Sequence, residues 1–300
     1  MKDLSQANAR LEEFARLIQT GEVKPHEGPL YAGVDLGTAN IVSAVVDGQG
    51  NPVAGVLTKS RSTVRDGLVL DYVGAIDILR KQIEQLKDKG LQLEYGAAAY
   101  PPGTTGRNAD SFGHVLQSVG LEVACLTDEP TAAAQALQIS QGCVVDVGGG
   151  TTGISVLQKG KVVYTADEPT GGHHIDLVIA GSYGIEEDEA EALKNDPQRQ
   201  LEVAPVVRPV FQKMATIVRD HLGRRKPPAL YLVGGTCAFP GVEQIMNAET
   251  GKPAVLPAWP LLVTPLGIAL ACLRSMTEPQ SDNGKGKQWT QAKFKIWPGK

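Results

Sequence analysis

Two segments of the sequence combine a carboxylate with glycines in a pattern suited to a Mg²⁺-nucleotide. They are Asp35-Leu-Gly-Thr38 and Asp146-Val-Gly-Gly-Gly-Thr-Thr152. Glycine has no β-carbon, so the backbone can approach a phosphate closely and donate N–H groups to its oxygens. The carboxylate before each turn is the kind of group that holds Mg²⁺ or its bound waters. One such turn is common in proteins, but two in similar surroundings predict a nucleotide site.

A third glycine turn, Leu232-Val-Gly-Gly-Thr236, follows a predicted strand and precedes a predicted helix. Its glycines would admit a base or ribose against the backbone, although a plain strand–helix turn can have the same pattern. The sequence contains no Walker A loop, and its one Gly-x-Gly-x-x-Gly match, at residues 148–153, leads into a predicted hairpin and not into a helix. P-loop and Rossmann nucleotide sites are therefore poor interpretations.

The elements around the first two turns follow the same order. Residues 30–57 and 143–166 each read as a strand, an acidic glycine turn and a hairpin, which indicates an internal duplication. Strands then alternate with helices, as in α/β folds with mixed sheets. The apolar spacing over 4–18 predicts an amphipathic helix, either packed on the body or docking a partner. Further helices are expected over 76–86, 110–120, 130–139 and 205–222.

Composition narrows the class of protein. The 300 residues have a formal net charge of -4 and only 5% aromatics, which argues against a nucleic-acid or anionic membrane partner. Several charged residues interrupt the first twenty positions, so we expect no secretory signal, and we expect no membrane span. None of Cys125, Cys143, Cys237 and Cys272 forms a CxxC pair. Buried reduced thiols in a cytoplasmic protein are the expectation.

Five segments stand in the order found in the superfamily of actin, sugar kinases and the seventy-kilodalton heat-shock chaperones. Residues 33–38, 128–134, 145–152, 232–236 and 264–269 resemble its first phosphate loop, first connecting helix, second phosphate loop, adenosine loop and second connecting helix. A closer resemblance is to the EutJ family, chaperone-like proteins encoded with ethanolamine-utilisation microcompartment genes. It rests on segments outside these loops, at 64–71, 100–104 and 165–174.

The resemblance implies an actin-like ATPase fold, which is α/β and ribonuclease H-like, with two duplicated lobes around a nucleotide cleft. The expected divisions of the chain are an N-terminal amphipathic helix at 1–28, lobe I at 29–135, lobe II at 136–263, a second connecting helix at 264–276 that returns to lobe I, and a mobile basic tail at 277–300.

The resemblance also implies roles for individual residues. Asp35 and Asp146 would hold Mg²⁺ through water, Glu129 would orient the attacking water, and the Thr151 hydroxyl would lie near the γ-phosphate. The nucleotide-binding residues implied in this way are Gly37, Thr38, Ala39, Gly148, Gly149, Gly150, Thr151, Thr152, Glu191, Lys194, Gly234, Gly235 and Thr236.

Other interpretations of these residues stay open. Glu129 could cap the helix that follows it, and Glu191 and Lys194 could lie on a solvated helix face. His173 and His174 suggest a metal, but two adjacent histidines without further ligands fit a loop better.

Several positions depart from the chaperone pattern. Gly153 stands where the chaperones have an aspartate, and Ala238 where they have an adenine-stacking arginine. Their catalytic lysine has no clear counterpart, and Lys59, Arg61 and Arg65 remain candidates. These departures favour slow hydrolysis or none.

The functional expectation is an ATP- or ADP-binding, Mg²⁺-dependent, chaperone-like switch that serves a microcompartment enzyme or shell protein, in the cytoplasm or at the microcompartment. The alternative is a catalytically weak scaffold that acts through protein interaction. A small-molecule kinase, an iron–sulfur activator ATPase and a filament or homo-oligomer also remain open. Trp289, Phe294 and Trp297 lie among lysines in the tail, which could bind an acidic or apolar partner surface or stay unstructured.

Overall fold

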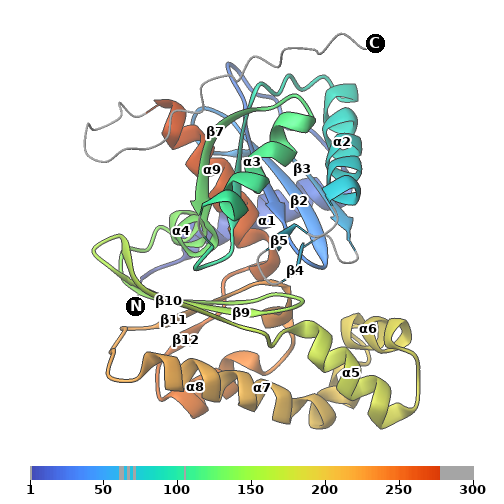
Figure 1. Cartoon of the computed structure of the whole chain (residues 1–300), viewed down its shortest axis with the longest axis vertical. Coiled ribbons are helices and arrows are strands. Elements are labelled where there is room, and N and C mark those ends of the chain that lie inside the picture. The colour runs from blue at the N-terminus through green and yellow to red at the C-terminus, as the bar shows by residue number, and fades with distance from the viewer. Residues whose placement is uncertain (1, 61–63, 66–67, 70–71, 105, 278–300) are drawn as a thin grey trace, which may run out of the picture.

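The computed structural model describes residues 2–60, 64–65, 68–69, 72–104 and 106–277. Arg61 and the side chain of Arg65, two of the candidate cations, lie outside the described residues. The predicted tail at 277–300 also lies outside them, apart from Thr277. The described elements form an upper and a lower lobe in Figure 1, with helices between two sheets.

Lobe I is built on a sheet of order β3-β2-β1-β6-β7. The first three strands are joined as antiparallel neighbours, whereas β6 and β7 run parallel to β1. Helices α2 (Tyr72–Asp88) and α3 (Arg107–Ser118) cover its outer face (Figure 1). The strands are β1 (Tyr31–Leu36), β2 (Asn40–Val46), β3 (Pro52–Lys59), β6 (Tyr95–Tyr100) and β7 (Glu122–Asp128). A short hairpin pairs β4 (Val64–Arg65) with β5 (Leu68–Val69).

Lobe II repeats this topology with the order β10-β9-β8-β11-β12 and the same strand directions. The predicted duplication is therefore confirmed. The strands are β8 (Gly142–Val147), β9 (Thr152–Gln158), β10 (Lys161–Glu168), β11 (Leu230–Val233) and β12 (Ala254–Val255). The helices on its outer face are α5 (Gly172–Tyr183), α6 (Glu187–Asn195), α7 (Gln200–Leu222) and α8 (Val242–Thr250). Two short 3₁₀ helices follow β11 and β12, namely η1 (Gly235–Ala238) and η2 (Pro260–Leu262).

Three helices fill the space between the sheets: α1 (Ser5–Thr20), α4 (Glu129–Ala136) and α9 (Val263–Thr277). One hydrophobic core includes residues from all three helices and from both sheets, so the lobes share a core. The stretch Pro260–Thr277, with mean hydropathy 1.4, is long and apolar enough to cross a membrane by length and composition alone. Burial of α9 in the shared core accounts for that composition.

The two connecting helices cross at very short range. A β-carbon added at Gly267 of α9 would lie 1.9 Å from the carbonyl oxygen of Ala132 in α4. One added at Gly33 of β1 would lie 2.1 Å from the backbone nitrogen of Ala269. Glycine is therefore required at both positions because backbone occupies the space of a side chain. The crossing fixes α4 and α9 against each other where the chain passes between lobes.

Helix α1 packs on the body, as one of the two sequence interpretations proposed. Leu11, Phe14 and Leu17 are fully buried, and Phe14 lies over Gly55 of β3, which has no side chain to exclude it. Asn8 accepts a hydrogen bond from the backbone nitrogen of Ala258 (3.0 Å), in the loop before η2. The helix thus contacts lobe I along its length and lobe II near its start.

Two helices begin earlier than the sequence suggested. We expected α7 to begin at Pro205, but it begins at Gln200 and contains Pro205 and Pro209. Proline lacks an N–H group and therefore fits most easily in the first turn of a helix. For that reason Pro205 was interpreted as the start of α7. Helix α5 begins at Gly172, so His173 and His174 lie in its first turn and not in a loop.

Candidate functional site

Asp35 and Asp146 occupy equivalent places in the two lobes, as the last-but-one residues of β1 and β8. Both side chains are partly buried, and the structure brings them close enough to repel each other. Burial, and then the charge of Asp146, raise the pKa of Asp35 to about 7. Burial also raises the pKa of Asp146 to about 6. The two predicted Mg²⁺ carboxylates therefore face a common site.

Glu129 joins this pair from the start of α4. Burial, and then the charges of Asp146 and Asp35, raise its pKa well above the usual range. The alternative in which Glu129 caps α4 is wrong, because Asp128 does so. The Asp128 carboxylate accepts hydrogen bonds from the backbone nitrogen (2.9 Å) and hydroxyl (2.8 Å) of Thr131. Glu129 is thereby left to face the other carboxyl groups.

The two predicted phosphate loops approach each other from opposite lobes. A β-carbon added at Gly149 would lie 3.1 Å from the Ala39 Cβ atom, and one at Gly150 would lie 3.6 Å from the Thr38 hydroxyl. In the first loop, a β-carbon at Gly37 would lie 2.8 Å from the carbonyl oxygen of Asn40. The backbones of the two loops are therefore close enough to contact one phosphate chain together.

The second loop is held in place by the rest of lobe II. The Gly148 carbonyl accepts hydrogen bonds from the Gly172 nitrogen (2.9 Å) and the Thr236 hydroxyl (2.8 Å). The Gly149 carbonyl accepts one from the His173 nitrogen (2.8 Å). Thr152 is fully buried and donates its hydroxyl to the Thr170 carbonyl (2.5 Å). Any contact of Thr152 with a nucleotide would have to come from its backbone.

The third glycine turn lies directly against the second loop. Gly234 has a φ of 88°, and a β-carbon there would lie 2.4 Å from both an Asp146 carboxylate oxygen and the Val147 carbonyl. Its nitrogen donates to the Pro260 carbonyl (3.0 Å). Gly235 is the first residue of η1, beside Leu261. This turn is thus fastened to the strand that carries Asp146.

Glu191 and Lys194, on one face of α6, are both engaged in ion pairs. The Lys194 ammonium lies 2.6 Å from Asp176 and 3.4 Å from the Gly172 carbonyl, and its side chain is largely buried. Lys194 is therefore not part of a solvated face. Glu191 pairs with Lys59 of β3 (3.3 Å), which brings the lysine candidate of lobe I across to lobe II. That pair is largely exposed and contributes little stability.

Two further residues of the site, Thr264 and Asp167, were not predicted from the sequence. Thr264, at the start of α9, is buried and donates its hydroxyl to Asp146 (3.3 Å). Asp167 on β10 is close enough for its charge to raise the pKa of Glu129 and Asp146. Thr264 lies in a quoted motif, but nothing in the sequence indicated its partner.

The carboxylates fit a hydrated Mg²⁺. Like charges held together under desolvation favour a counter-cation, and carboxylate oxygens are hard ligands of the kind Mg²⁺ prefers. Among the described residues, no group of three His, Cys, Asp or Glu side chains is placed to ligate a metal together. Mg²⁺ usually keeps several waters, so the arrangement suits contact through water.

Without Mg²⁺ or nucleotide, the free energy of unfolding is expected to fall as pH rises from about 4 to about 7. Aspartates in the unfolded chain have a pKa near 4. In the folded chain the pKa of Asp35 is about 7 and that of Asp146 is about 6. The folded chain therefore holds more protons in this window, which gives a negative slope. Urea unfolding across the window measures it, and Asp35→Asn should flatten the slope. An unchanged slope in that variant would contradict the assignment.

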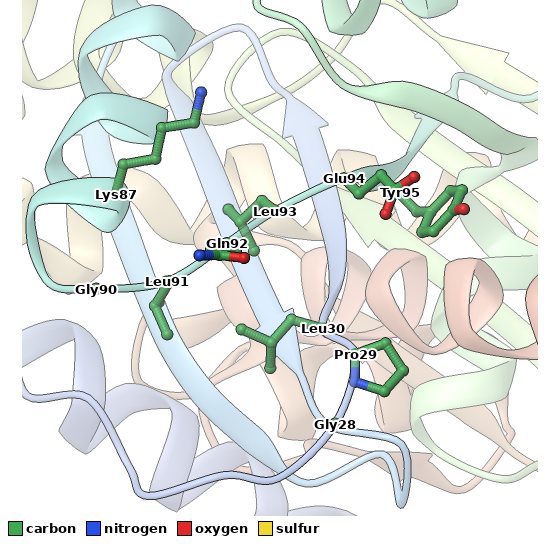
Figure 2. A pocket seen from close by; sticks show the side chains of 10 residues that line it. All are labelled: Gly28, Pro29, Leu30, Lys87, Gly90, Leu91, Gln92, Leu93, Glu94 and Tyr95. Atoms are coloured by element: carbon green, nitrogen blue, oxygen red, sulfur yellow. The ribbon is translucent and has the colours of Figure 1, made fainter.

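A separate cavity lies at the other end of lobe I. It measures about 620 Å³ and is lined by residues of the α2 end and of the segments leading into β1 and β6, among them Leu30, Leu91 and Leu93 (Figure 2). Asp35 lies at the opposite end of β1. This cavity is therefore not part of the carboxylate site.

Comparisons with known proteins agree on the architecture. A family model described as "Cell division protein FtsA" matches residues 143–267, and one described as "MreB/Mbl protein" matches residues 56–187. The crystal structure of MreB5 of Spiroplasma citri bound to ADP has a TM-score of 0.66 at 18% identity, covering 83% of this chain and 98% of that one. At that identity the likeness concerns the fold alone.

Two relatives are much more similar in sequence. "Ethanolamine utilization protein EutJ" of Escherichia coli strain K12 is 46% identical over 245 residues, which are 81% of this chain and 86% of that protein. The crystal structure of ethanolamine utilization protein EutJ from Carboxydothermus hydrogenoformans has a TM-score of 0.85 at 48% identity. It covers 90% of this chain and 99% of that chain.

Proposed function

The chain belongs to the EutJ family and has the actin-like fold, and on that premise we propose that it binds ATP or ADP with Mg²⁺ between its lobes. In this proposal it acts in ethanolamine utilisation as a chaperone-like switch in the bacterial cytoplasm. Nucleotide binding would set the separation of the lobes, and a microcompartment enzyme or shell protein would be the client.

The observation that carries the proposal is the meeting of the two loops over shared carboxylates. Thr38 and Ala39 of lobe I lie against Gly149 and Gly150 of lobe II. A polyphosphate bound there would contact both lobes, so its presence or loss would change how tightly they close. Closure about connecting segments is a common way for a ligand to switch a two-lobed protein.

The residues divide the work of binding. Backbone N–H groups of the two loops would donate to phosphate oxygens, while Asp35 and Asp146 would hold Mg²⁺ through its waters. The Mg²⁺ ion supplies positive charge that neutralises the phosphates when it is bound. The third turn, Gly234 to Thr236, and the pair Glu191 and Lys194 would face the nucleoside.

Hydrolysis, where it occurs, would depend on Glu129. An ionised Glu129 would accept a hydrogen bond from water and direct its oxygen at the γ-phosphorus. The bond from that phosphorus to the bridging oxygen of ADP would then break, yielding ADP and phosphate. Without bound cation, burial and the neighbouring charges raise the pKa of Glu129, which favours its protonated form. A bound cation would offset those charges, so we expect Glu129 to orient water better in the Mg²⁺-loaded site.

A scaffold that binds nucleotide but turns it over poorly is the second candidate. It is favoured because Lys59, the described candidate for a catalytic lysine, is paired with Glu191 at the surface. An iron–sulfur activator of the same fold is disfavoured. Such an activator needs exposed cysteines, whereas Cys143, Cys237 and Cys272 are buried and Cys125 is partly buried.

Calorimetric titration of the protein with ATP, with and without Mg²⁺, tests the proposal. We expect binding that strengthens with Mg²⁺, and steady phosphate release then separates the switch from the scaffold. Binding without any phosphate release favours the scaffold. A lack of nucleotide binding in either condition would overturn the proposal, and ADP production that requires an added acceptor would point to a kinase. Sedimentation with ATP would reveal a filament.

A further inference from the structure

Asp167 stands in one row with Asp146 across lobe II. Gly153 of the middle strand β9 is paired with Asp146 of β8 on one side and with Asp167 of β10 on the other. Directly opposite residues of antiparallel strands place their side chains on the same face of the sheet. The two carboxylates therefore project from one face, on either side of a residue that has no side chain.

The Asp167 carboxylate leans over Gly153. The position that a β-carbon of Gly153 would occupy lies 3.8 Å from an Asp167 carboxylate oxygen and 3.8 Å from the Asp146 Cβ atom. Opposite β-carbons are usually about 4.5–5.5 Å apart, so an oxygen at the shorter distance has turned toward β8. The Cγ atom of Pro102, from lobe I, lies 3.5 Å from the same position. The row therefore faces the space between the lobes.

The charge of Asp167 is directed at the carboxylate site. Its negative charge acts on Glu129 and on Asp146, although it belongs to the edge strand β10 and could have turned to solvent. The next residue, Glu168, points to the opposite face and pairs with His221 (2.8 Å). Glu168 thus contacts a histidine on one face of β10, while Asp167 adds charge to the carboxylate site on the other.

We propose that Asp167 is a further positioning residue for the divalent cation, acting from β10 together with Asp35 and Asp146. This inference rests on the proposed function, since the cation is the one that accompanies the nucleotide. The absence of a side chain at Gly153 lets the carboxylate of a neighbouring strand reach the site. Asp167 would help to hold the hydrated cation from β10, the strand on the far side of β9 from Asp146.

The test is a titration of Mg²⁺ into the full-length protein saturated with ADP. Asp167→Asn is expected to weaken Mg²⁺ affinity about tenfold or more, as for other groups that hold metal-bound waters. Its affinity for ADP without Mg²⁺ should be unchanged or higher. Glu168→Gln is the matched control, because it removes the same charge from the adjacent position and should leave Mg²⁺ affinity as in the wild type.

A rescue variant separates a cation role from a merely structural one. In Gly153→Asp/Asp167→Ala the carboxylate is moved from β10 to β9, where the nearest neighbour of the new β-carbon would be the Pro102 Cγ atom at 3.5 Å, an ordinary packing distance. We expect this double variant to recover Mg²⁺ affinity to within about threefold of the wild type. Asp167→Ala alone should not recover it.

The outcomes distinguish this inference from the proposed function. If Asp146→Asn weakens Mg²⁺ binding but Asp167→Asn matches the wild type, the role of Asp167 is overturned and the nucleotide site stands. If the wild type binds ADP with no dependence on Mg²⁺, both proposals are overturned. If the rescue variant stays as weak as Asp167→Ala, the cation role of the carboxylate is rejected.

Discussion

Asp146→Asn is expected to weaken Mg²⁺-nucleotide binding by about 10- to 100-fold, the effect usual for groups that hold metal-bound waters. Any phosphate release should fall by about 10² to 10⁴-fold. Asparagine keeps an oxygen to accept the hydrogen bond that Thr264 donates, so the start of α9 is retained. The lost charge, rather than a lost contact, is then the cause. Calorimetry and a phosphate-release assay measure the two effects.

The melting temperature of Asp146→Asn distinguishes a lost charge from misfolding, because a misfolded variant would melt at a lower temperature than the wild type. Burial raises the pKa of Asp146 to about 6, so at neutral pH its charge opposes folding in the absence of ligand. Asp146→Asn should therefore melt at the same or a higher temperature than the wild type without Mg²⁺. Glu129→Gln provides the comparison, with binding retained and phosphate release lost. A variant of Asp146 that binds Mg²⁺-nucleotide normally would remove this aspartate from the site.

Gly267→Ala is expected to destabilise the protein by about 3 kcal/mol or more, at the upper end of the cost of overpacking. The added carbon would lie 1.9 Å from the Ala132 carbonyl oxygen, which is backbone and cannot rotate away. Helices α4 and α9 would have to separate, which opens the core shared by the lobes. Urea unfolding and a melting temperature lower by about 6 °C or more would show this.

Gly181→Ala in α5 is the matched control, because no atom lies within 4 Å of its added carbon. Alanine favours an exposed helix position over glycine, so this variant should be more stable by about 0.5–1 kcal/mol. If Gly267→Ala were as stable as the wild type, the close crossing of α4 and α9 would be wrong. The contrast between two identical substitutions isolates the effect of space.

Local patterns were enough to predict much of the fold. The two strand–turn–hairpin units became β1 to β3 and β8 to β10, because alternation and turn residues act within a few positions of one another. The family resemblance is also confirmed by the relatives. The short strand β12, and the helix starts at Gln200 and Gly172, were missed. Tertiary packing determines these, and the prolines of α7 concealed its first turn.

Part of the candidate site could be predicted in the same way. Asp35, Asp146 and Glu129 each lie next to a turn or helix start, so their motifs pointed to them and the structure brings them together. Asp167 and Thr264 could not be found, since their relation to Asp146 depends on strand pairing and on the return of α9. From the sequence, Gly153 was noted only because the chaperones have an aspartate at that position. Its position between Asp146 and Asp167 is known only from the strand pairing.

The bond between Asn8 and Ala258 joins positions 250 residues apart and has a practical consequence. The first turn of α1 is hydrogen-bonded to lobe II, whereas the rest of that helix packs against lobe I. A dye attached in the first turn of α1 would therefore lie where the two halves meet, so it could report on movement between them but could also obstruct it. Labels meant to leave that movement undisturbed belong on the outer helices α2 or α8.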